Sequence, residues 1–242
     1  MRRRSAVRRH DRRARVSEAP ERPRKAMILA AGRGERLRPL TDQTPKPLLE
    51  VRGKPLIQYH IERLAHLGVL DIVINLAWLG AMIRGYLGDG SRFGVRIEYS
   101  EETPHALETA GGIFRALPRL GPAAFLVLNG DVFTDYPLAQ AALAPNRDAH
   151  IVLVPNPPQH PDGDFGLEHG LALPSAPIQY TFSGIAVYRP AFFAHCVDGA
   201  FPLKPLLLRS MATRHCSAEL YRGIWEDVGT PERLAALNAP IR

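Results

Sequence analysis

Residues 29–48 read LAAGRGERLRPLTDQTPKPL, a segment rich in glycine, arginine and proline that directly follows a short apolar run. The apolar run that leads into it, AMILAA at 26–31, is too short for a helix and is followed by glycines, which indicates a buried strand. Gly32 and Gly34 allow a tight turn after that strand and bring backbone N–H groups to the surface. Positive side chains then surround the turn, namely Arg33, Arg36, Arg38 and Lys46. This pattern is typical of a site for a polyanion, and we expect a nucleoside triphosphate.

Apolar strands and amphipathic helices alternate along the chain after this turn. The segment 55–68, for example, begins with Pro55, ends at Gly68 and carries apolar residues at helical spacing, so it is expected to be a helix. The alternation predicts a Rossmann-like, mostly parallel sheet flanked by helices. The expected order is strand 26–31, helix 55–68, strand 71–77, helix 79–88, strand 95–100, helix 109–120 and strand 124–131.

The pattern changes after about Pro145. Another strand is expected at 149–155, and it is followed by a polar loop rich in Pro and Gly. A β-rich run at 178–188 comes next, with helices near 190–196 and 203–213. We therefore predict extra strands and a small lobe joined to the core sheet. No tandem hexapeptides occur, so a C-terminal parallel β-helix is not expected.

The net charge of +7 is concentrated in residues 1–24, which hold ten arginines and three acidic residues. The remaining 21 basic and 21 acidic residues balance. Because this segment has almost no apolar content, we expect a disordered extension. It lacks the apolar centre of a secretory signal, and no run in the chain is long enough to span a membrane. An Arg-rich arm could contact nucleic acid or anionic lipid, but a solvated tail or a start-codon artefact is favoured, and no nucleic-acid partner is expected.

The cysteines and histidines form no catalytic or metal-binding pattern. Cys196 and Cys216 are the two cysteines, with no CxxC pair, so neither a disulfide framework nor a zinc site is indicated. The nine histidines show no ligand spacing. The cytoplasm is the expected compartment.

Two aspartates, one just after a predicted strand and one just before a predicted helix, lie at positions suited to binding a metal ion. Asp131 ends the run VLNGD after a buried strand, and Asp227 lies in GIWEDVGT just before a helix that begins at 230–231. Taken singly, each aspartate is more often a turn or helix cap. A hard divalent cation, however, needs few carboxylates when phosphates and waters complete its octahedron.

The opening stretch carries a family resemblance. LAAGRGERLRPLT followed by PKPL resembles the signature of the sugar-1-phosphate nucleotidyltransferases, or NDP-sugar pyrophosphorylases. The resemblance implies that Arg36 and Lys46 are catalytic, since reaction at phosphorus needs positive charge where negative charge builds up. It also implies that the nucleotide is held by the loop residues Ala31, Gly32, Arg33 and Gly34.

Five further motifs resemble that family. NGD and W-x-D-x-G-T imply that Asp131 and Asp227 bind Mg²⁺. LETAGG departs mildly from LETGGG at Ala110, and it implies nucleotide contacts from Glu108, Thr109 and Gly111. FSGI, GDF and NGD imply sugar contacts from Asn129, Asp164, Ser183 and Gly184. Related enzymes often add a lysine for the sugar phosphate. The segment VPNPPQHPDGDF of the lobe offers none, and Lys204 further along the chain has no assigned role.

The resemblance runs from about Lys25 to Leu237 and is strongest to the short bacterial N-acetylmuramate-1-phosphate uridylyltransferases, mainly through AWLG and LGDGSRFG. It implies uridylyl transfer from UTP to that sugar phosphate in cell-wall recycling, with release of pyrophosphate. It implies a single domain over 25–242, with a monomer favoured as the acting unit. Its expected parts are a nucleotide-binding core at about 25–148, a sugar-side lobe at about 149–225, and a metal aspartate and helix within 226–242.

Three other activities fit the same motifs. The chain could be a mannose-1-phosphate guanylyltransferase, or a glucose-1-phosphate thymidylyl- or uridylyltransferase. It could instead be a non-catalytic subunit that senses a nucleotide sugar. The intact set of Arg36, Lys46, Asp131 and Asp227 argues against the sensing subunit.

Overall fold

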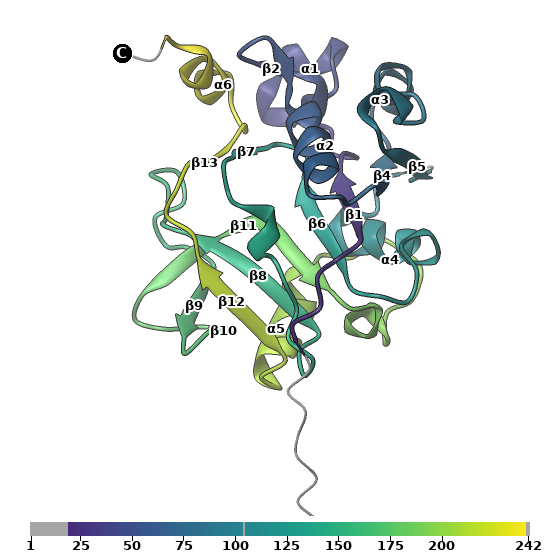
Figure 1. The fold of residues 1–242 in the computed structure, drawn as a ribbon. Coiled ribbons are helices and arrows are strands. Elements are labelled where there is room, and N and C mark those ends of the chain that lie inside the picture. The colour runs from purple at the N-terminus through teal and green to yellow at the C-terminus, as the bar shows by residue number, and fades with distance from the viewer. Residues whose placement is uncertain (1–18, 104, 241–242) are drawn as a thin grey trace, which may run out of the picture.

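The strand that precedes the glycine loop, β1 (Lys25–Leu29), lies inside a nine-stranded sheet (Figure 1). In this computed structural model, which describes residues 19–103 and 105–240, β1 pairs in parallel with β4 (Asp71–Leu76) and β6 (Phe125–Asn129). The next strand, β5 (Arg96–Glu101), pairs in parallel with β4. These four strands are the predicted parallel core. Strands β1, β4 and β6 are short and largely apolar because helices cover both faces, whereas the edge strand β5 (RIEYSE) mixes buried and exposed residues.

Three predicted helices cover this core. Alternate residues of β1 face opposite sides, so Ile28 packs with α2 (Leu56–His66) and α3 (Gly80–Leu87). Met27 packs on the other side with α4 (Glu108–Leu120). The helices therefore lie on both faces of the sheet, as the alternation in the sequence predicts.

The second half of the chain extends the same sheet. The long strand β11 (Gln179–Tyr188) pairs antiparallel with β6 and with β8 (Ala149–Val154). Beyond β8 lies β12 (Cys216–Leu220), which pairs in parallel with it. Two short strands, β10 (Leu171–Leu173) and β9 (Phe165–Glu168), form the far edge. The full order is β5-β4-β1-β6-β11-β8-β12-β10-β9.

Two predictions for this half need correction. The segment 190–196 is not an α-helix, because only a short 3₁₀ turn, Pro190–Phe193, forms there. Strand β12 was not predicted, since its sequence CSAEL has little apolar character. The other expected helix is present as α5 (Lys204–Ala212), which packs on the same face as α4.

Small elements complete the edge at which β1 and β6 end. The hairpin β2 (Glu50–Val51) and β3 (Lys54–Pro55) packs beside α6 (Pro231–Asn238). Strand β7 (Val132–Thr134) pairs antiparallel with β13 (Trp225–Asp227), far away in the sequence. Short helical turns are α1 (Leu40–Gln43) and the 3₁₀ segments Glu35–Leu37, Lys46–Leu48, Ser91–Phe93 and Leu138–Gln140.

The last part of the segment 1–24, which we expected to be disordered, packs against the domain. Glu21 exchanges backbone hydrogen bonds with Leu143, at 2.8 and 2.9 Å. Its carboxylate accepts the backbone N–H of Ala124 and pairs with Arg189. Residues 19–24 therefore belong to the folded part, and the rest of the predicted extension, 1–18, lies outside the described residues. None of the helices in the described ranges has the length and apolar character needed to cross a bilayer.

Candidate active site

Two pockets open beyond the carboxyl ends of β1 and β6, where ligands bind in open α/β sheets. Both are lined by Asn129 and Asp131. The loop pocket, with a volume of about 230 Å³, is otherwise lined mainly by Ala30, Ala31, Gly32, Lys46, Asn75, Glu102, Glu108 and Thr109. The strand pocket, of about 360 Å³, is otherwise lined mainly by Arg36, Gln159, His160, Thr181, Phe182, Ser183, Trp225 and Asp227.

Asp131 lies where the two pockets meet because of the turn that precedes it. Gly130 donates its backbone N–H to the Leu29 carbonyl at 2.9 Å, which ties the turn to the end of β1. A Cβ atom at position 130 would lie 2.7 Å from that carbonyl oxygen, so only glycine allows this approach. The NGD sequence thus places the Asp131 carboxylate at the edge of the sheet.

Asp227 reaches the same pocket from the other end of the chain. Strands β13 and β7 pair so that Asp227 lies opposite Val132, the residue after Asp131. The backbone N–H of Val228 also donates to the Asp131 carbonyl at 2.9 Å. This pairing brings together the two aspartates that the sequence predicts to bind metal.

Each of these carboxylates contacts a cationic side chain. Lys46 Nζ pairs with Asp131 Oδ2, and the lysine side chain is only 11% exposed. Arg233 Nη1 pairs with Asp227 Oδ1, which also accepts Gln159 Nε2 at 3.1 Å. Burial and the neighbouring Asp227 raise the pKa of Glu226, the next carboxyl along the chain.

The two aspartates fit a magnesium ion that shares its coordination with substrate. Within the described ranges, no group of three or more His, Cys, Asp or Glu side chains is arranged to hold a metal. Mg²⁺ usually takes one or two protein carboxylates and completes its octahedron with phosphates and waters. Asp131 and Asp227 in one pocket match that donor set.

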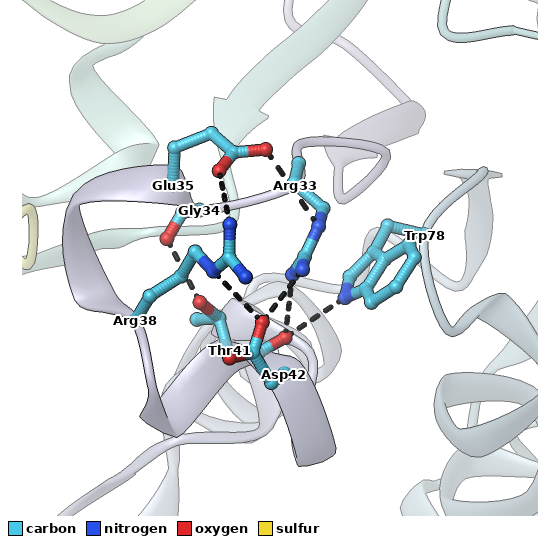
Figure 2. Close-up of polar contacts among 7 residues, drawn as sticks. All are labelled: Arg33, Gly34, Glu35, Arg38, Thr41, Asp42 and Trp78. Carbon is cyan, nitrogen blue, oxygen red and sulfur yellow. Dashed lines mark hydrogen bonds and ion pairs between the residues drawn. The ribbon is translucent and has the colours of Figure 1, made fainter.

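Arg33 uses its side chain to hold the glycine loop in shape (Figure 2). Its guanidinium donates to the Thr41 carbonyl at 2.8 Å and to Asp42 at 2.7 Å, and it lies over the Trp78 ring. The Arg33 hydrogen bond lowers the pKa of Asp42. Arg33 lines neither pocket, because its side chain is held by these loop contacts, and its contact with a nucleotide stays a prediction.

Gly34 closes the same loop from within. It has φ 69°, and a Cβ atom there would lie 2.9 Å from the Thr41 side chain. Thr41 Oγ1 donates to the Gly34 carbonyl at 2.9 Å. The resulting turn leaves Arg36 exposed at the strand pocket, and no carboxylate of residues 19–103 or 105–240 pairs with it.

A buried polar chain that the sequence did not reveal forms the back of the loop pocket. Asn75 accepts the Ala30 backbone N–H at 2.8 Å and donates to Glu102 at 2.7 Å. Glu102 in turn accepts the Leu107 backbone N–H at 2.7 Å. These bonds fix the ends of β1 and β4 and the loop before α4. The one signal in the sequence was Asn75, a polar residue near the end of the apolar strand β4.

The start of α4 brings two of its three predicted residues to the loop pocket. Glu108 and Thr109 line it, and Glu108 has φ 58°, a conformation that few non-glycine residues adopt. Gly111 lies elsewhere. A Cβ atom there would lie 2.2 Å from the Gly199 carbonyl oxygen, so this glycine serves close packing and lines neither pocket.

Of the residues predicted to contact the sugar, some line a pocket and others do not. Asn129 and Ser183 line the strand pocket, but the Ser183 hydroxyl donates to the Val152 carbonyl at 2.7 Å. Gly184, at φ 78°, lets the Asn129 amide lie directly over it. Asp164 lines neither pocket. Its carboxylate accepts the Phe182 backbone N–H at 2.9 Å and lies 3.8 Å from Lys204 Nζ.

Comparison with known proteins places the chain among enzymes that act on sugar phosphates. Residues 25–169 match the nucleotidyl transferase family. An N-acetylmuramate alpha-1-phosphate uridylyltransferase of Neisseria meningitidis serogroup B is 50% identical over 229 residues, covering 89% of this chain and 97% of that protein. One of the same name from Caulobacter vibrioides is 35% identical over 237 residues, 90% of this chain and 97% of that protein. A mannose-1-phosphate guanylyltransferase of Mycobacterium tuberculosis is 38% identical over 115 residues, 48% of this chain and 32% of that protein.

Solved structures share the fold. The inositol-1-phosphate CTP transferase from T. maritima superposes with a TM-score of 0.73 at 18% identity, covering 93% of this chain and all of that one. HddC from Yersinia pseudotuberculosis, in complex with GMP-PN, gives 0.72 at 21% identity over 88% of this chain and 97% of that one. The fold and the sequence matches agree, and the chain belongs to the nucleotidyl transferase family.

Proposed function

We propose that this nucleotidyltransferase transfers a uridylyl group from UTP to N-acetylmuramate 1-phosphate, forming UDP-N-acetylmuramate and pyrophosphate in cell-wall recycling. The observation that carries the proposal is the position of Asp131 at the junction of two pockets. One is lined by the glycine loop, and the other by Arg36 and Asp227. A reaction that joins two anionic substrates at one phosphorus atom needs such a junction.

The substrates are assigned to the pockets by their linings. The loop pocket offers the backbone of Ala31 and Gly32 and the buried Lys46, which suit UTP. The strand pocket offers Thr181, Ser183 and Asn129, which suit the sugar phosphate. The sugar phosphate oxygen would attack the α-phosphorus, and pyrophosphate would leave on the opposite side.

The side chains around the junction supply positive charge for this displacement. Arg36 is exposed at the strand pocket and is free to meet an incoming phosphate. Lys46 is held between Pro45 and Pro47 at the start of a 3₁₀ turn, so its ammonium is presented from a fixed backbone. Both would offset the charge that develops at the α-phosphate.

Asp131 and Asp227 would hold Mg²⁺. Bound there, the ion supplies positive charge to the phosphate oxygens and orients them for the displacement. The acting unit is proposed to be a monomer. An enzyme that consumes UTP is expected to act in the cytoplasm, where that nucleotide is made.

The extent of the sequence matches favours the muramate substrate over mannose. The guanylyltransferase match covers 48% of the chain, whereas the two N-acetylmuramate relatives match about 90% of it. A sensing subunit is disfavoured because Arg36, Lys46, Asp131 and Asp227 are all present at the pockets.

A substrate panel tests the proposal. Pyrophosphate release should be measured for UTP, dTTP and GTP, each with N-acetylmuramate, glucose and mannose 1-phosphates. We expect the highest kcat/KM for UTP with N-acetylmuramate 1-phosphate. A higher kcat/KM for GTP with mannose 1-phosphate would identify a mannose-1-phosphate guanylyltransferase instead. A higher kcat/KM for dTTP or UTP with glucose 1-phosphate would identify a glucose-1-phosphate thymidylyl- or uridylyltransferase. Nucleotide binding without turnover for any pair would indicate a sensor.

A further inference from the structure

Arg233 is the cationic partner of Asp227, and no motif in the sequence predicted it. It lies in the first turn of α6, where its backbone N–H donates to the capping hydroxyl of Thr230 at 3.4 Å. Its guanidinium pairs with Asp227 Oδ1, and its side chain is 17% exposed. An arginine thus contacts the carboxylate that the proposed function gives to a metal.

Gly229 makes room for this guanidinium. A Cβ atom at position 229 would lie 2.2 Å from Arg233 Nη2 and 3.0 Å from Asp227 Oδ2. The glycine of the DVGT sequence therefore allows the arginine to lie across the backbone beside Asp227. Any larger residue would displace the guanidinium.

The helix that carries Arg233 is fixed to the body of the protein. Leu234 and Leu237 pack against the buried cluster that includes Val51. Asn238 donates to the Glu50 carbonyl at 3.0 Å and accepts the Arg52 backbone N–H at 2.6 Å. With the backbone held on this side, the guanidinium can change partners without movement of α6.

The two ion pairs neutralise the site while it holds no divalent cation. Lys46 balances Asp131, and Arg233 balances Asp227. A metal ion that binds both aspartates repels these two cations, because like charges a few ångströms apart in a partly buried site interact unfavourably. Arg233 lines neither pocket itself, but its partner Asp227 lines the strand pocket, so a released guanidinium would have to turn toward that pocket to reach a phosphate group. Arginine can bind phosphate oxygens in a bidentate manner.

We propose that Arg233 exchanges partners during the catalytic cycle. It holds Asp227 before the metal binds, and afterwards it binds a phosphate oxygen of the substrates. The inference rests on the proposed function, since it needs Asp227 to bind metal. It offers a cation to a substrate phosphate next to Asp227, whereas Lys204 lies near Asp164, which lines neither pocket. The phosphate can belong to the sugar phosphate or to UTP.

Two binding measurements on Arg233→Gln test this exchange. Mn²⁺ binding to the free enzyme should be about 3- to 10-fold tighter, because a cation that competes for Asp227 is gone. In the presence of Mg²⁺, one of the two substrates should bind about 10- to 100-fold more weakly, as expected for the loss of a charged hydrogen bond. Calorimetry with each substrate alone shows which one supplies the phosphate.

Three further variants sharpen the result. Gly229→Ala keeps the charge but displaces the guanidinium, so it should change both affinities in the same directions. Arg233→Lys should restore the metal affinity of the wild type but only part of the substrate affinity. Arg52→Gln is the control, because Arg52 contacts the same helix at the Leu237 carbonyl. It should change neither affinity, and melting temperatures should confirm that all variants are folded.

The outcomes separate this inference from the proposed function. If the wild type binds UTP and transfers it while Arg233→Gln binds both substrates as tightly as the wild type, the exchange is wrong and the function stands. If Arg233→Gln binds Mn²⁺ more weakly, Arg233 only positions Asp227, and the exchange is again wrong. If the wild type shows no uridylyl transfer with any sugar phosphate, the proposed function itself fails.

Discussion

The guanidinium of Arg33 lies 3.6 Å from the centre of the Trp78 ring, and both side chains donate to the Thr41 carbonyl, at 2.8 and 2.9 Å (Figure 2). A residue of the glycine loop is thereby joined to the segment between β4 and α3. The arrangement fixes the loop before any ligand arrives, which lowers the entropic cost of binding a triphosphate.

Trp78→Ala should loosen this loop. It removes a cation–π contact worth about 0.5–2 kcal/mol and a hydrogen bond worth about 1 kcal/mol, so we expect a loss of about 1–3 kcal/mol in unfolding free energy. The KM for UTP should rise more than kcat falls, because the catalytic side chains remain. Trp78→Phe keeps an aromatic ring but loses the N–H donor. Its unfolding free energy and its KM for UTP should lie between those of the wild type and those of Trp78→Ala. Urea unfolding and steady-state kinetics measure both effects, and an unchanged KM in Trp78→Ala would show that the loop keeps its shape without the ring.

Asp131→Asn and Asp227→Asn should each lower kcat by orders of magnitude. Each keeps the size of the side chain but removes a negative charge that the proposed metal needs. Glu226→Gln is the matched control, because Glu226 is next in sequence to Asp227 but lines neither pocket. It should retain near-normal turnover at saturating UTP and Mg²⁺. Near-normal turnover in both aspartate variants, with melting temperatures like the wild type, would contradict the metal assignment.

Gly184→Ala should damage both stability and turnover. Position 184 has φ 78°, and a new Cβ atom would lie 2.5 Å from the Asn129 amide, which lines both pockets. Gly170→Ala provides the comparison. Position 170 has φ 74° but no atom within 4 Å of the new Cβ. Gly170→Ala should lose only about 1–2 kcal/mol of unfolding free energy, the cost of a left-handed backbone conformation for alanine, and its kcat should not change. Equal turnover in the two variants would mean that the position of Asn129 does not matter to the reaction.

The sequence predicts the core of this fold well because its strands are buried on both faces. Strands β1, β4 and β6 are largely apolar, so their runs stand out, and the glycine loop marks the edge that is expected to bind ligand. Strand β12 is not visible in the sequence, because CSAEL owes its place to pairing with β8 rather than to its own pattern.

The candidate site is only partly predictable from the sequence, because motifs are visible there but isolated contacts between distant residues are not. Asp131 and Asp227 lie in motifs, and pairing of β7 with β13 brings them together. Asn75 and Glu102 each make two hydrogen bonds to residues distant in the fold or in a loop, and such contacts leave no periodic pattern in the chain. Arg233 is one charged residue on a polar helix, and only the three-dimensional structure shows that it faces Asp227.

Protein stability should fall in mild acid because of His60. This side chain is 1% exposed, and burial, with a contribution from Arg63, lowers its pKa to about 4. The unfolded chain takes up the proton near pH 6.5, but the folded protein resists it down to about pH 4. Stability is therefore full above pH 6.5 and declines by up to about 3 kcal/mol as the pH falls to 4. His60→Leu should lose this part of the pH dependence. The unfolding free energy of both proteins should be measured with urea between pH 7 and pH 4. If it falls by the same amount in His60→Leu as in the wild type, His60 is not the source of this pH dependence.

Arg36 and Lys46 should act on the transition state more than on substrate binding. Both are proposed to offset charge that grows at the α-phosphate, so Arg36→Ala should lower kcat by about 10²-fold or more with a smaller rise in the KM for UTP. Arg36→Lys should recover little, because a point charge does not reproduce the fork that a guanidinium offers to two phosphate oxygens. Lys46→Ala also leaves Asp131 without its ion-pair partner, so it should lower kcat and change metal affinity as well.

These variants separate catalysis from a structural role in the loop. Arg36 makes no ion pair with a carboxylate of the described residues, so its removal should leave the melting temperature unchanged. Arg33→Ala is the matched control, because Arg33 is bound to Thr41, Asp42 and Trp78 within the same loop. It should lower the melting temperature and raise the KM for UTP, while kcat at saturating UTP changes much less than in Arg36→Ala. A wild-type kcat in Arg36→Ala would show that the positive charge of this loop is only solvated, and the phosphate contacts would then have to come from Lys46 and the loop backbone.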